Sequence, residues 1–338
     1  MNKSFFLMIV GVLALLTGCQ EASETVAETS FEADKHVVNI AYGNQPGEPI
    51  DLQAEKWKEL AEERSDGRLQ LNLYPSSQLG DEADMIELAI NGNNLIVFTA
   101  FDFLMDYVPD LGILSAPYIA ENEEELFYLT KTDWFKGLEA DLKEEANLEI
   151  ISSNTLYGDR HIMSNKPVET PEDLEGLRIR VPDNNLYIRS FAAMGASPAP
   201  LPLGDLYSSL QQGVIDGAEN PLPVLTGSRT HEVTNHLSLT GHMTIISPWV
   251  IGSDVLNNLP EDLQEILIES SEEAGDYGIE LSKKAEEDTM KELEEQGMNI
   301  HEVDQEPFEA EAEKVYESMP TWSDGLYEKV QKLLEERE

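Results

Sequence analysis

The sequence predicts an α/β fold in which helices flank a parallel or mixed sheet. Segments with the apolar content or alternation of strands are repeatedly followed by segments with apolar residues at helical spacing. A chain of 338 residues with 41% hydrophobic residues is long enough to build the cores of two domains. A second series of strand and helix segments follows residue 157, so we expect the chain to cross between domains near Tyr157 and Gly158.

The first series of elements is predicted between residues 37 and 98. Ile50, Ala54 and Trp57 recur at helical spacing, whereas Leu69 and Leu71 alternate with polar residues as in a half-buried strand. In order, we expect a strand at 37–42, a turn at 43–47, a helix from 50 to the Asp66-Gly67 stop, a strand at 69–74, a helix at 81–90 and a strand at 95–98.

The later elements follow the same patterns. We expect helices at 121–129 and 133–146, strands at 148–152 and 176–181, helices at 184–194 and 203–212, a strand at 298–303 and helices at the C-terminus. Residues 260–296 are predicted to be almost continuously helical. Gly275 and Gly278 leave open whether this stretch is one long kinked helix or two helices.

The first twenty residues, MNKSFFLMIVGVLALLTGCQ, have the pattern of an export signal. Lys3 precedes an apolar run that is short for a transmembrane helix, and small residues precede Cys19. This segment resembles the lipobox of bacterial lipoproteins, which implies a signal peptide at 1–19 and lipidation of Cys19. The acidic stretch 20–36 lacks apolar periodicity and is predicted to be a flexible tether. We therefore expect an exported protein, lipid-anchored to the outer face of the cytoplasmic membrane, at the cell surface or in a periplasm.

Charge and cysteine content exclude several classes of function. The net charge is -44, with 66 acidic and 22 basic residues, so a phosphate backbone would be repelled and nucleic-acid binding is not expected. Cys19 is the only cysteine, which excludes an intramolecular disulfide and, because it belongs to the export signal, nucleophilic cysteine chemistry.

Motifs typical of enzymes are missing from the sequence. It contains no HExxH, GxSxG, P-loop or strand-to-helix GxGxxG pattern, and its six histidines are scattered. We expect no metal and no cofactor. Asp216 and Glu219, in YSSLQQGVIDGAENP, are one helical turn apart and could form a catalytic pair, but acids beside glycines are also common in turns and caps.

Two arginines occupy a special position in GLRIRVP, residues 176–182. Alternation places Arg178 and Arg180 on the opposite side from the apolar residues of this strand, where both could simply be solvated. However, Pro182 ends the strand directly after Arg180, and strand ends in open α/β sheets are where ligands bind. Because the guanidinium fork matches a carboxylate, this position favours an anionic ligand.

The same region resembles the solute-binding proteins of tripartite ATP-independent periplasmic (TRAP) transporters of the C4-dicarboxylate-binding type. The resemblance rests on GLRIRVPDNNLYIRSFAAMGASPAPLPLGDLYSSLQQGVIDGAENP at 176–221, YPSSQLGD at 74–81 and APYIAEN at 116–122. It extends from about residue 37 to the C-terminus. It implies a two-lobed, periplasmic-binding-protein-like (Venus flytrap) α/β fold with mixed sheets, crossing strands and a long connecting helix. The implied lobes are 37–157 plus 246–285 and 158–245 plus 286–338.

The resemblance also implies the function and the site. A monomer would capture a small organic acid, a C4-dicarboxylate or a sugar acid such as a uronate or sialic acid, and deliver it to membrane permease subunits driven by an ion gradient. Arg180 would be the main partner of the ligand carboxylate, Asn220 would hydrogen-bond the same group, and Arg160 would be a second contact or gate. The remaining candidate ligand-binding residues are Asp183, Tyr42, Asn44, Thr99 and Ala100.

Two departures from the family pattern argue against sialic acid as the ligand. Asp183 stands where several sugar-acid binders have a polar neutral residue, and the stretch 98–101 lacks an acid that some sialic-acid binders place there. Two other classes of function remain as alternatives, an enzyme that uses Asp216 and Glu219 and a component of an ATP-driven importer. The role of Glu219 stays open between steadying a turn and pairing with a neighbouring base.

Overall fold

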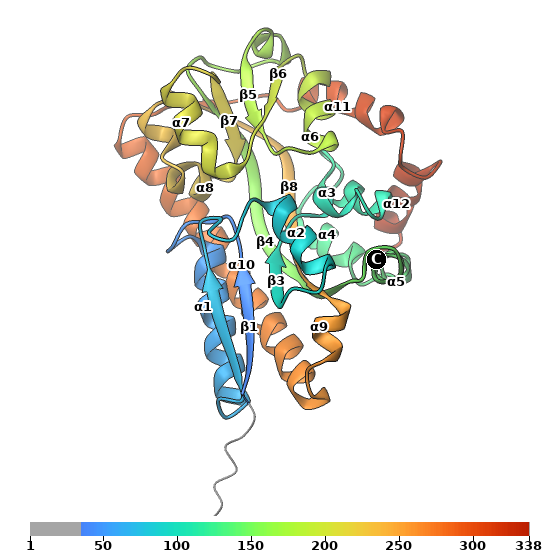
Figure 1. Ribbon diagram of the computed structural model, residues 1–338. Coiled ribbons are helices and arrows are strands. Elements are labelled where there is room, and N and C mark those ends of the chain that lie inside the picture. Colours follow the sequence, from blue (N-terminus) through green and yellow to red (C-terminus); the bar gives the residue numbers. More distant parts are fainter. Residues whose placement is uncertain (1–34, 338) are drawn as a thin grey trace, which may run out of the picture. The chain divides into compact units, whose positions relative to one another are not determined.

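The computed structural model describes residues 35–337, so the predicted signal peptide, Cys19 and most of the predicted tether lie outside the described residues. Within this range the strands form one mixed sheet with the order β2-β1-β3-β8-β4-β7-β5-β6, and β9 pairs with β8 (Figure 1). No helix of residues 35–337 is long and apolar enough to cross a membrane. The strands are β1 (His36–Ala41), β2 (Leu69–Tyr74), β3 (Leu95–Phe98), β4 (Leu148–Ser164), β5 (Arg178–Val181), β6 (Ser197–Pro200), β7 (Gly217–Asn220), β8 (His236–Gly252) and β9 (Asn299–Glu302).

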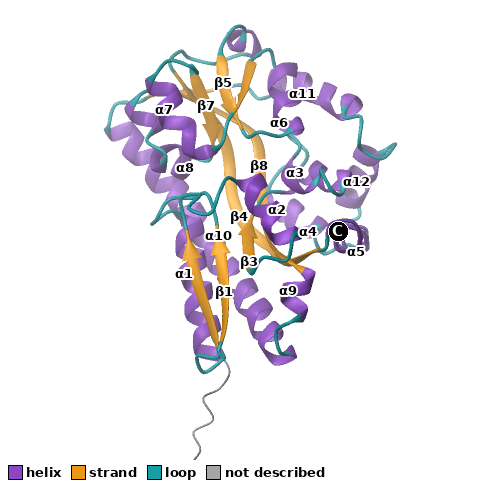
Figure 2. Ribbon diagram, in the orientation of Figure 1, coloured by secondary structure: helices purple, strands orange, loops and turns teal. Residues whose placement is uncertain are grey.

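Helices cover both faces of this sheet (Figure 2). The α-helices are α1 (Pro49–Arg64), α2 (Glu82–Ile90), α3 (Phe101–Leu104), α4 (Glu123–Leu129), α5 (Asp133–Ala146), α6 (Asn185–Ala193), α7 (Leu206–Gln211), α8 (Leu222–Gly227), α9 (Ser253–Asn257), α10 (Glu261–Glu295), α11 (Glu306–Ser318) and α12 (Leu326–Glu335). Short 3₁₀ helices lie at Pro109–Ser115, Pro171–Leu174, Leu203–Asp205 and Thr230–Glu232.

Two long antiparallel strands, β4 and β8, run through the whole sheet. Each has 17 residues, and their pairing is interrupted by register shifts, including one between Leu156 and Gly158. Such bulges bend and twist strands, so the two ends of the ribbon serve different parts of the sheet. The C-terminal end of β8 pairs with β3. At the opposite end of the ribbon, the C-terminal end of β4 pairs with β7. We call the part with β1, β2 and β3 the first lobe and the part with β5, β6 and β7 the second lobe.

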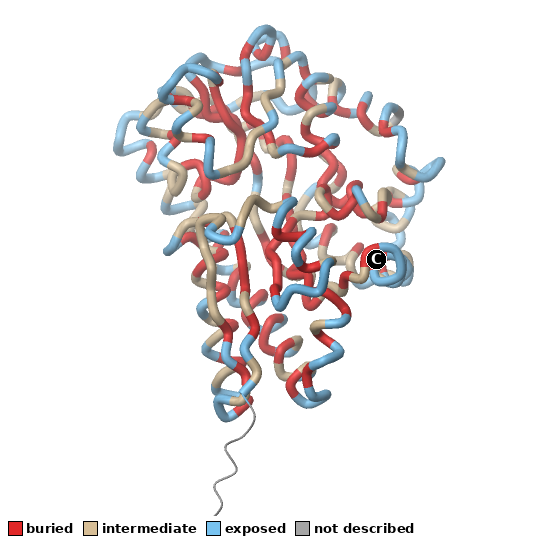
Figure 3. Tube along the Cα trace, in the orientation of Figure 1, coloured by how far each residue is buried: buried red, intermediate tan, exposed pale blue. Residues whose placement is uncertain are grey.

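The first lobe has an apolar core on each face of its sheet, because successive side chains of a strand point to opposite faces. Ile40 and Ile96 pack with α1 and α10, whereas Ala41 and Val97 pack with the helices of the other face. Leu326 of the C-terminal helix α12 also joins this second core. The main strands of both lobes are buried, whereas the outer faces of the surrounding helices are exposed (Figure 3).

The second lobe repeats this arrangement. Ile179 and Met243 pack with α6 and α11 on one face, and Ala218 and Leu237 pack with α7 and α8 on the other. The lobe boundaries expected from the sequence stay a prediction.

The long helix is a single element, α10, of 35 residues. A Cβ atom on Gly275 would lie 2.2 Å from Oδ1 of Asn154, and one on Gly278 would lie 2.3 Å from Oε1 of Gln53. The glycines therefore allow β4 and α1 to approach the helix closely, and they do not end it. Trp57 of α1 fixes the same contact, because its Nε1 donates a hydrogen bond of 2.9 Å to the carbonyl of Leu267.

Candidate functional site

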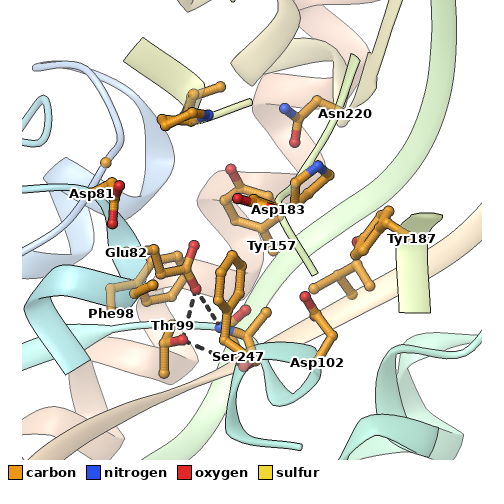
Figure 4. A pocket seen from close by; sticks show the side chains of 18 of the residues that line it. Asp81, Glu82, Phe98, Thr99, Asp102, Tyr157, Asp183, Tyr187, Asn220 and Ser247 are labelled. Atoms are coloured by element: carbon orange, nitrogen blue, oxygen red, sulfur yellow. Dashed lines mark hydrogen bonds between the residues drawn. The ribbon is translucent and has the colours of Figure 1, made fainter. Parts of the chain in front are cut away.

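A pocket of about 140 Å³ lies where the two lobes meet, and residues of both lobes line it (Figure 4). The first lobe contributes the connection after β1, the start of α2 and the segment from Phe98 to Phe103. The second lobe contributes the ends of β5 and β7, the segment 201–203 and Tyr187 of α6. The crossing strands contribute Tyr157, Arg160, Ile245 and Ser247.

Arg180 is the buried cation of this pocket. Its neighbours in β5, Ile179 and Val181, point into the core of the second lobe, and Arg180 itself is only 3% exposed. Nε of Arg180 donates a hydrogen bond of 2.9 Å to the carbonyl of Leu201, and no carboxylate among residues 35–337 forms an ion pair with this guanidinium. Burial and the nearby charge of Arg160 lower the pKa of Arg180 to about 10, because neither is balanced by a partner in contact. The pocket therefore contains an unneutralised guanidinium.

Arg178, two residues earlier in the same strand, lies in a different environment. Its side chain is half exposed and forms a bidentate pair with Asp216, with Nε to Oδ2 at 2.9 Å and Nη2 to Oδ1 at 2.8 Å. The expectation of a solvated arginine face thus holds for Arg178 and not for Arg180.

Arg160, the second arginine of the pocket, is neutralised by Glu219 inside the protein. Its Nε and Nη2 lie 2.5 Å and 2.8 Å from the two carboxylate oxygens of Glu219, and both side chains are buried. Nε2 of His242 lies 3.2 Å from the same carboxylate, and Nδ1 of His242 lies 2.8 Å from Oγ1 of Thr240. Burial raises the pKa of Glu219, but the charge and hydrogen bonds of Arg160 outweigh it and leave that pKa below its ordinary value.

These contacts show where the carboxyl groups of Asp216 and Glu219 lie. Asp216 pairs with Arg178, whereas Glu219 is buried against Arg160. The two carboxylates therefore face different partners and do not converge on one cleft. Glu219 pairs with a base, which is one of the two roles left open above, and it lies within strand β7 rather than in a turn.

Asn220 ends β7 beside this pair and is 2% exposed. Its Oδ1 is buried and accepts no hydrogen bond from the described residues. A buried polar atom without a partner is costly unless a ligand or water satisfies it, so Asn220 is poised to bind a polar group in the pocket.

Carboxyl groups of the first lobe form the opposite wall. Oε1 of Glu82 accepts hydrogen bonds from Oγ1 of Thr99 at 2.7 Å and from the backbone N–H of Ala100 at 3.0 Å (Figure 4). Burial and the charge of Asp102 raise the pKa of Glu82 to about 7, and burial raises the pKa of Asp102 to about 6. Asp102 accepts a hydrogen bond of 2.5 Å from Nδ2 of Asn184.

Most of the residues expected to form the site come together in this one pocket. They are Arg180, Arg160, Asn220, Asp183, Asn44, Thr99 and Ala100. Tyr42 is the exception, because its ring is buried against Trp249 and its hydroxyl donates a hydrogen bond of 2.7 Å to Asp51. Cys19 lies outside the described residues.

Sequence reasoning missed Glu82, Asp102, Tyr157, Tyr187 and Ser247, all of which line the pocket. Glu82 follows Asp81, whose side chain caps α2, so an acid in this first turn has an ordinary structural explanation. No group of three or more His, Cys, Asp or Glu side chains within residues 35–337 is arranged to hold a metal ion.

Comparison with known proteins identifies the relatives of this chain. The model of the family described as "DctP: Bacterial extracellular solute-binding protein, family 7" matches residues 40–321. A crystal structure of a TRAP periplasmic solute-binding protein from Actinobacillus succinogenes with bound L-galactonate is 40% identical. It covers 89% of this chain and 100% of its own chain, with a TM-score of 0.87.

A second crystal structure, of a TRAP periplasmic solute-binding protein from Ochrobacterium anthropi with bound L-fuconate, is 42% identical. It covers 89% of this chain and 99% of its own, with a TM-score of 0.86. Among curated sequences, the sialic acid-binding periplasmic protein SiaP of Vibrio cholerae is 28% identical over 306 residues, which cover 90% of this chain and 92% of SiaP.

Proposed function

Because the chain belongs to bacterial extracellular solute-binding protein family 7, whose members serve TRAP transporters, we propose that its ligand is a sugar acid of the aldonate type. As a family member it captures a small carboxylate outside the cytoplasm for an ion-gradient-driven permease. The observation that carries the proposal is the buried guanidinium of Arg180, which has no carboxylate partner among residues 35–337. Relatives with 40% and 42% identity hold L-galactonate and L-fuconate.

Arg180 and Asn220 of the second lobe bind the carboxylate of the ligand. A carboxylate accepts two parallel charge-assisted hydrogen bonds from a guanidinium, which suits Arg180 because only its Nε is hydrogen-bonded within residues 35–337. Nδ2 of Asn220 can donate to the same carboxylate, whereas its Oδ1, which has no partner in the described chain, can accept from a ligand hydroxyl. Arg160 stays paired with Glu219, so its charge is already neutralised. It contributes to the pocket mainly by its shape and by stacking on the ring of Tyr187.

The acidic wall selects hydroxyl groups at the other end of the ligand. Oε1 of Glu82 is engaged by Thr99 and Ala100, and Oδ1 of Asp102 is buried without a hydrogen bond from the described residues. The remaining oxygens can accept from ligand hydroxyls. A second carboxylate placed there would face like charges in a buried pocket, which disfavours a C4-dicarboxylate.

Closure of the lobes follows from the same geometry. The carboxylate partners belong to the second lobe and the hydroxyl partners to the first, so a ligand of sufficient length contacts both. Its differential affinity for the closed form shifts the equilibrium between open and closed forms.

Calorimetric titration of the purified protein tests the ligand class. L-galactonate and L-fuconate should bind, whereas galactitol, which lacks the carboxylate, and succinate, which lacks the hydroxyls, should bind at least about 100-fold more weakly. A ligand at 100 times its dissociation constant should also add about 2.7 kcal/mol to the free energy of unfolding. Mass spectrometry should recover the acid unchanged. Tight binding of succinate with no binding of either sugar acid would overturn the proposal.

We further propose that lipidation of Cys19 tethers the protein to the membrane as a monomer. The support is the sequence around Cys19, which resembles a lipobox, and the acidic stretch that follows it. Several acyl chains hold a protein stably where a single chain does not. Fractionation of cells that express Cys19→Ala should move the protein from the membrane to the soluble fraction, and unchanged membrane association would exclude this anchor.

A further inference from the structure

We propose that Glu48 is a positioning residue that links closure of the lobes to the ligand pocket. Its carboxyl group holds Asn44, which lines the pocket, and it occupies the space beside Gly227 on the opposite lobe. Glu48 itself does not line the ligand pocket. The inference rests on the proposed ligand site, since it concerns how that site is completed.

On the first lobe, Glu48 directly precedes α1 and is only 7% exposed. Its Oε2 accepts a hydrogen bond of 2.7 Å from Nδ2 of Asn44. Asn44 is 2% exposed and belongs to the connection after β1, and this hydrogen bond holds its amide in the wall of the pocket. Burial raises the pKa of Glu48 to about 7, although the hydrogen bond from Asn44 opposes this shift.

On the second lobe, Gly227 is the last residue of α8. The leucines of this helix, Leu222 and Leu225, are buried in a core of the second lobe. A Cβ atom on Gly227 would lie 1.9 Å from Oε1, 2.8 Å from Cδ and 3.2 Å from Cγ of Glu48, and these are the three nearest heavy atoms. Gly227 does not have the positive φ that alanine avoids, so Glu48 is the obstacle to a side chain at this position.

The contact joins elements that are otherwise packed in separate cores. Glu48 moves with the first lobe, whereas α8 begins immediately after Asn220-Pro221 and moves with the carboxylate site. A methyl group at residue 227 must therefore displace the carboxyl group of Glu48, which breaks its hydrogen bond to Asn44, or hold the lobes apart. Both outcomes weaken ligand binding without removing a ligand contact.

A double-mutant cycle on ligand affinity tests this inference, with the acid from the titration panel that binds the wild type as the probe. Gly227→Ala should weaken binding at least about tenfold in the wild-type background and less than about twofold in the Glu48→Ala background, because coupled residues are not additive. Gly204→Ala is the matched control. Gly204 lies with Glu48 and Gly227 in the lining of a small crevice, but a Cβ atom on Gly204 would meet no atom within 4 Å. The ligand affinity of Gly204→Ala should therefore stay within about twofold of wild type.

A second pair of variants keeps the test independent of Gly227. Glu48→Gln retains an oxygen that can accept from Asn44 and should bind within about threefold of wild type, whereas Glu48→Ala should lose about tenfold. Melting temperatures without ligand should stay close to the wild-type value for all variants. Equal losses from Gly227→Ala in both backgrounds, or equal affinities for the two Glu48 variants, would overturn the inference. If the wild type binds an acid of another class, the proposed ligand class is wrong. The double-mutant cycle on Gly227 and Glu48 can then be measured with that acid.

Discussion

Replacing Arg180 with alanine removes the cation to which we assign the ligand carboxylate. Truncating one partner of a buried charge pair costs about 2–5 kcal/mol, which corresponds to a loss of affinity between about 30-fold and several thousand-fold. The empty protein should respond in the opposite direction. Burial and Arg160 lower the pKa of Arg180 to about 10, so the unpaired charge destabilises the ligand-free protein. Arg180→Ala without ligand should therefore melt at a temperature no lower than the wild type.

Titration calorimetry with the cognate acid and a thermal melt without ligand measure the two effects. Arg178→Ala is the matched control, because the side chain of Arg178 is 46% exposed and pairs with Asp216 at the surface. Its affinity should be almost unchanged. Arg180→Lys should lie between the two, since lysine keeps the charge and loses the fork. Wild-type affinity in Arg180→Ala, or an equal loss in Arg178→Ala, would refute the assignment of the carboxylate to Arg180.

Two further predictions concern the remaining charges of the site. Glu219→Ala leaves Arg160 buried without its partner and should lower the free energy of unfolding by about 3–5 kcal/mol in denaturant titrations, whereas Asp216→Asn, at an exposed pair, should cost at most about 1 kcal/mol. Equal losses of unfolding free energy in the two variants would mean that the buried pair of Arg160 and Glu219 contributes no more to stability than the exposed pair. Because the pKa values of Glu82 and Asp102 are raised to about 7 and about 6, their contribution to stability is fully present below about pH 4 and is lost as the pH rises through 6 to 7. Calorimetric scans from pH 4 to 8 should show a smaller decline in Glu82→Gln than in wild type, and an identical decline would contradict the raised pKa of Glu82.

Local patterns in the sequence predicted short strands, both where the two faces differ, as in β2, and where all residues are buried, as in β3. β2 was predicted because Leu69 and Leu71 are buried while Gln70 is exposed. β8 was missed although it is the longest strand together with β4. Its residues 245–252 are all buried and show no alternation, and Gly241 and Pro248 interrupt its sequence. Its role as a crossing strand depends on pairing with β3 and β4, which a local pattern does not contain.

The candidate site was predictable where position in the chain restricts chemistry. Arg180 could be found because a strand end followed by Pro182 places a side chain at the edge of the sheet. The partnership of Arg160 with Glu219 joins residues 59 positions apart, and no local feature reveals which of two arginines the protein neutralises. Tyr42 differs from these residues. It follows a strand that leads to the pocket, but its ring is buried against Trp249 and does not line the pocket.

The two buried arginines of the pocket support the proposal that the site binds one carboxylate and several hydroxyls. If Glu219 were absent, two unpaired guanidinium groups would share the pocket, and the empty closed form would be strongly disfavoured. If a second carboxylate of the protein neutralised Arg180 as well, a ligand carboxylate would lose its hydration without gaining a charged partner. The observed arrangement, with Arg160 paired and Arg180 without a carboxylate partner in the described part of the chain, leaves one positive charge for a ligand. The raised pKa values of Glu82 and Asp102 place partly protonated carboxyls opposite this charge, and such groups can both donate to and accept from hydroxyls. A ligand with a single anionic end and a hydroxylated body, as proposed above, would therefore pair with Arg180 and could satisfy the two buried oxygens that lack a partner in this pocket, Oδ1 of Asp102 and Oδ1 of Asn220.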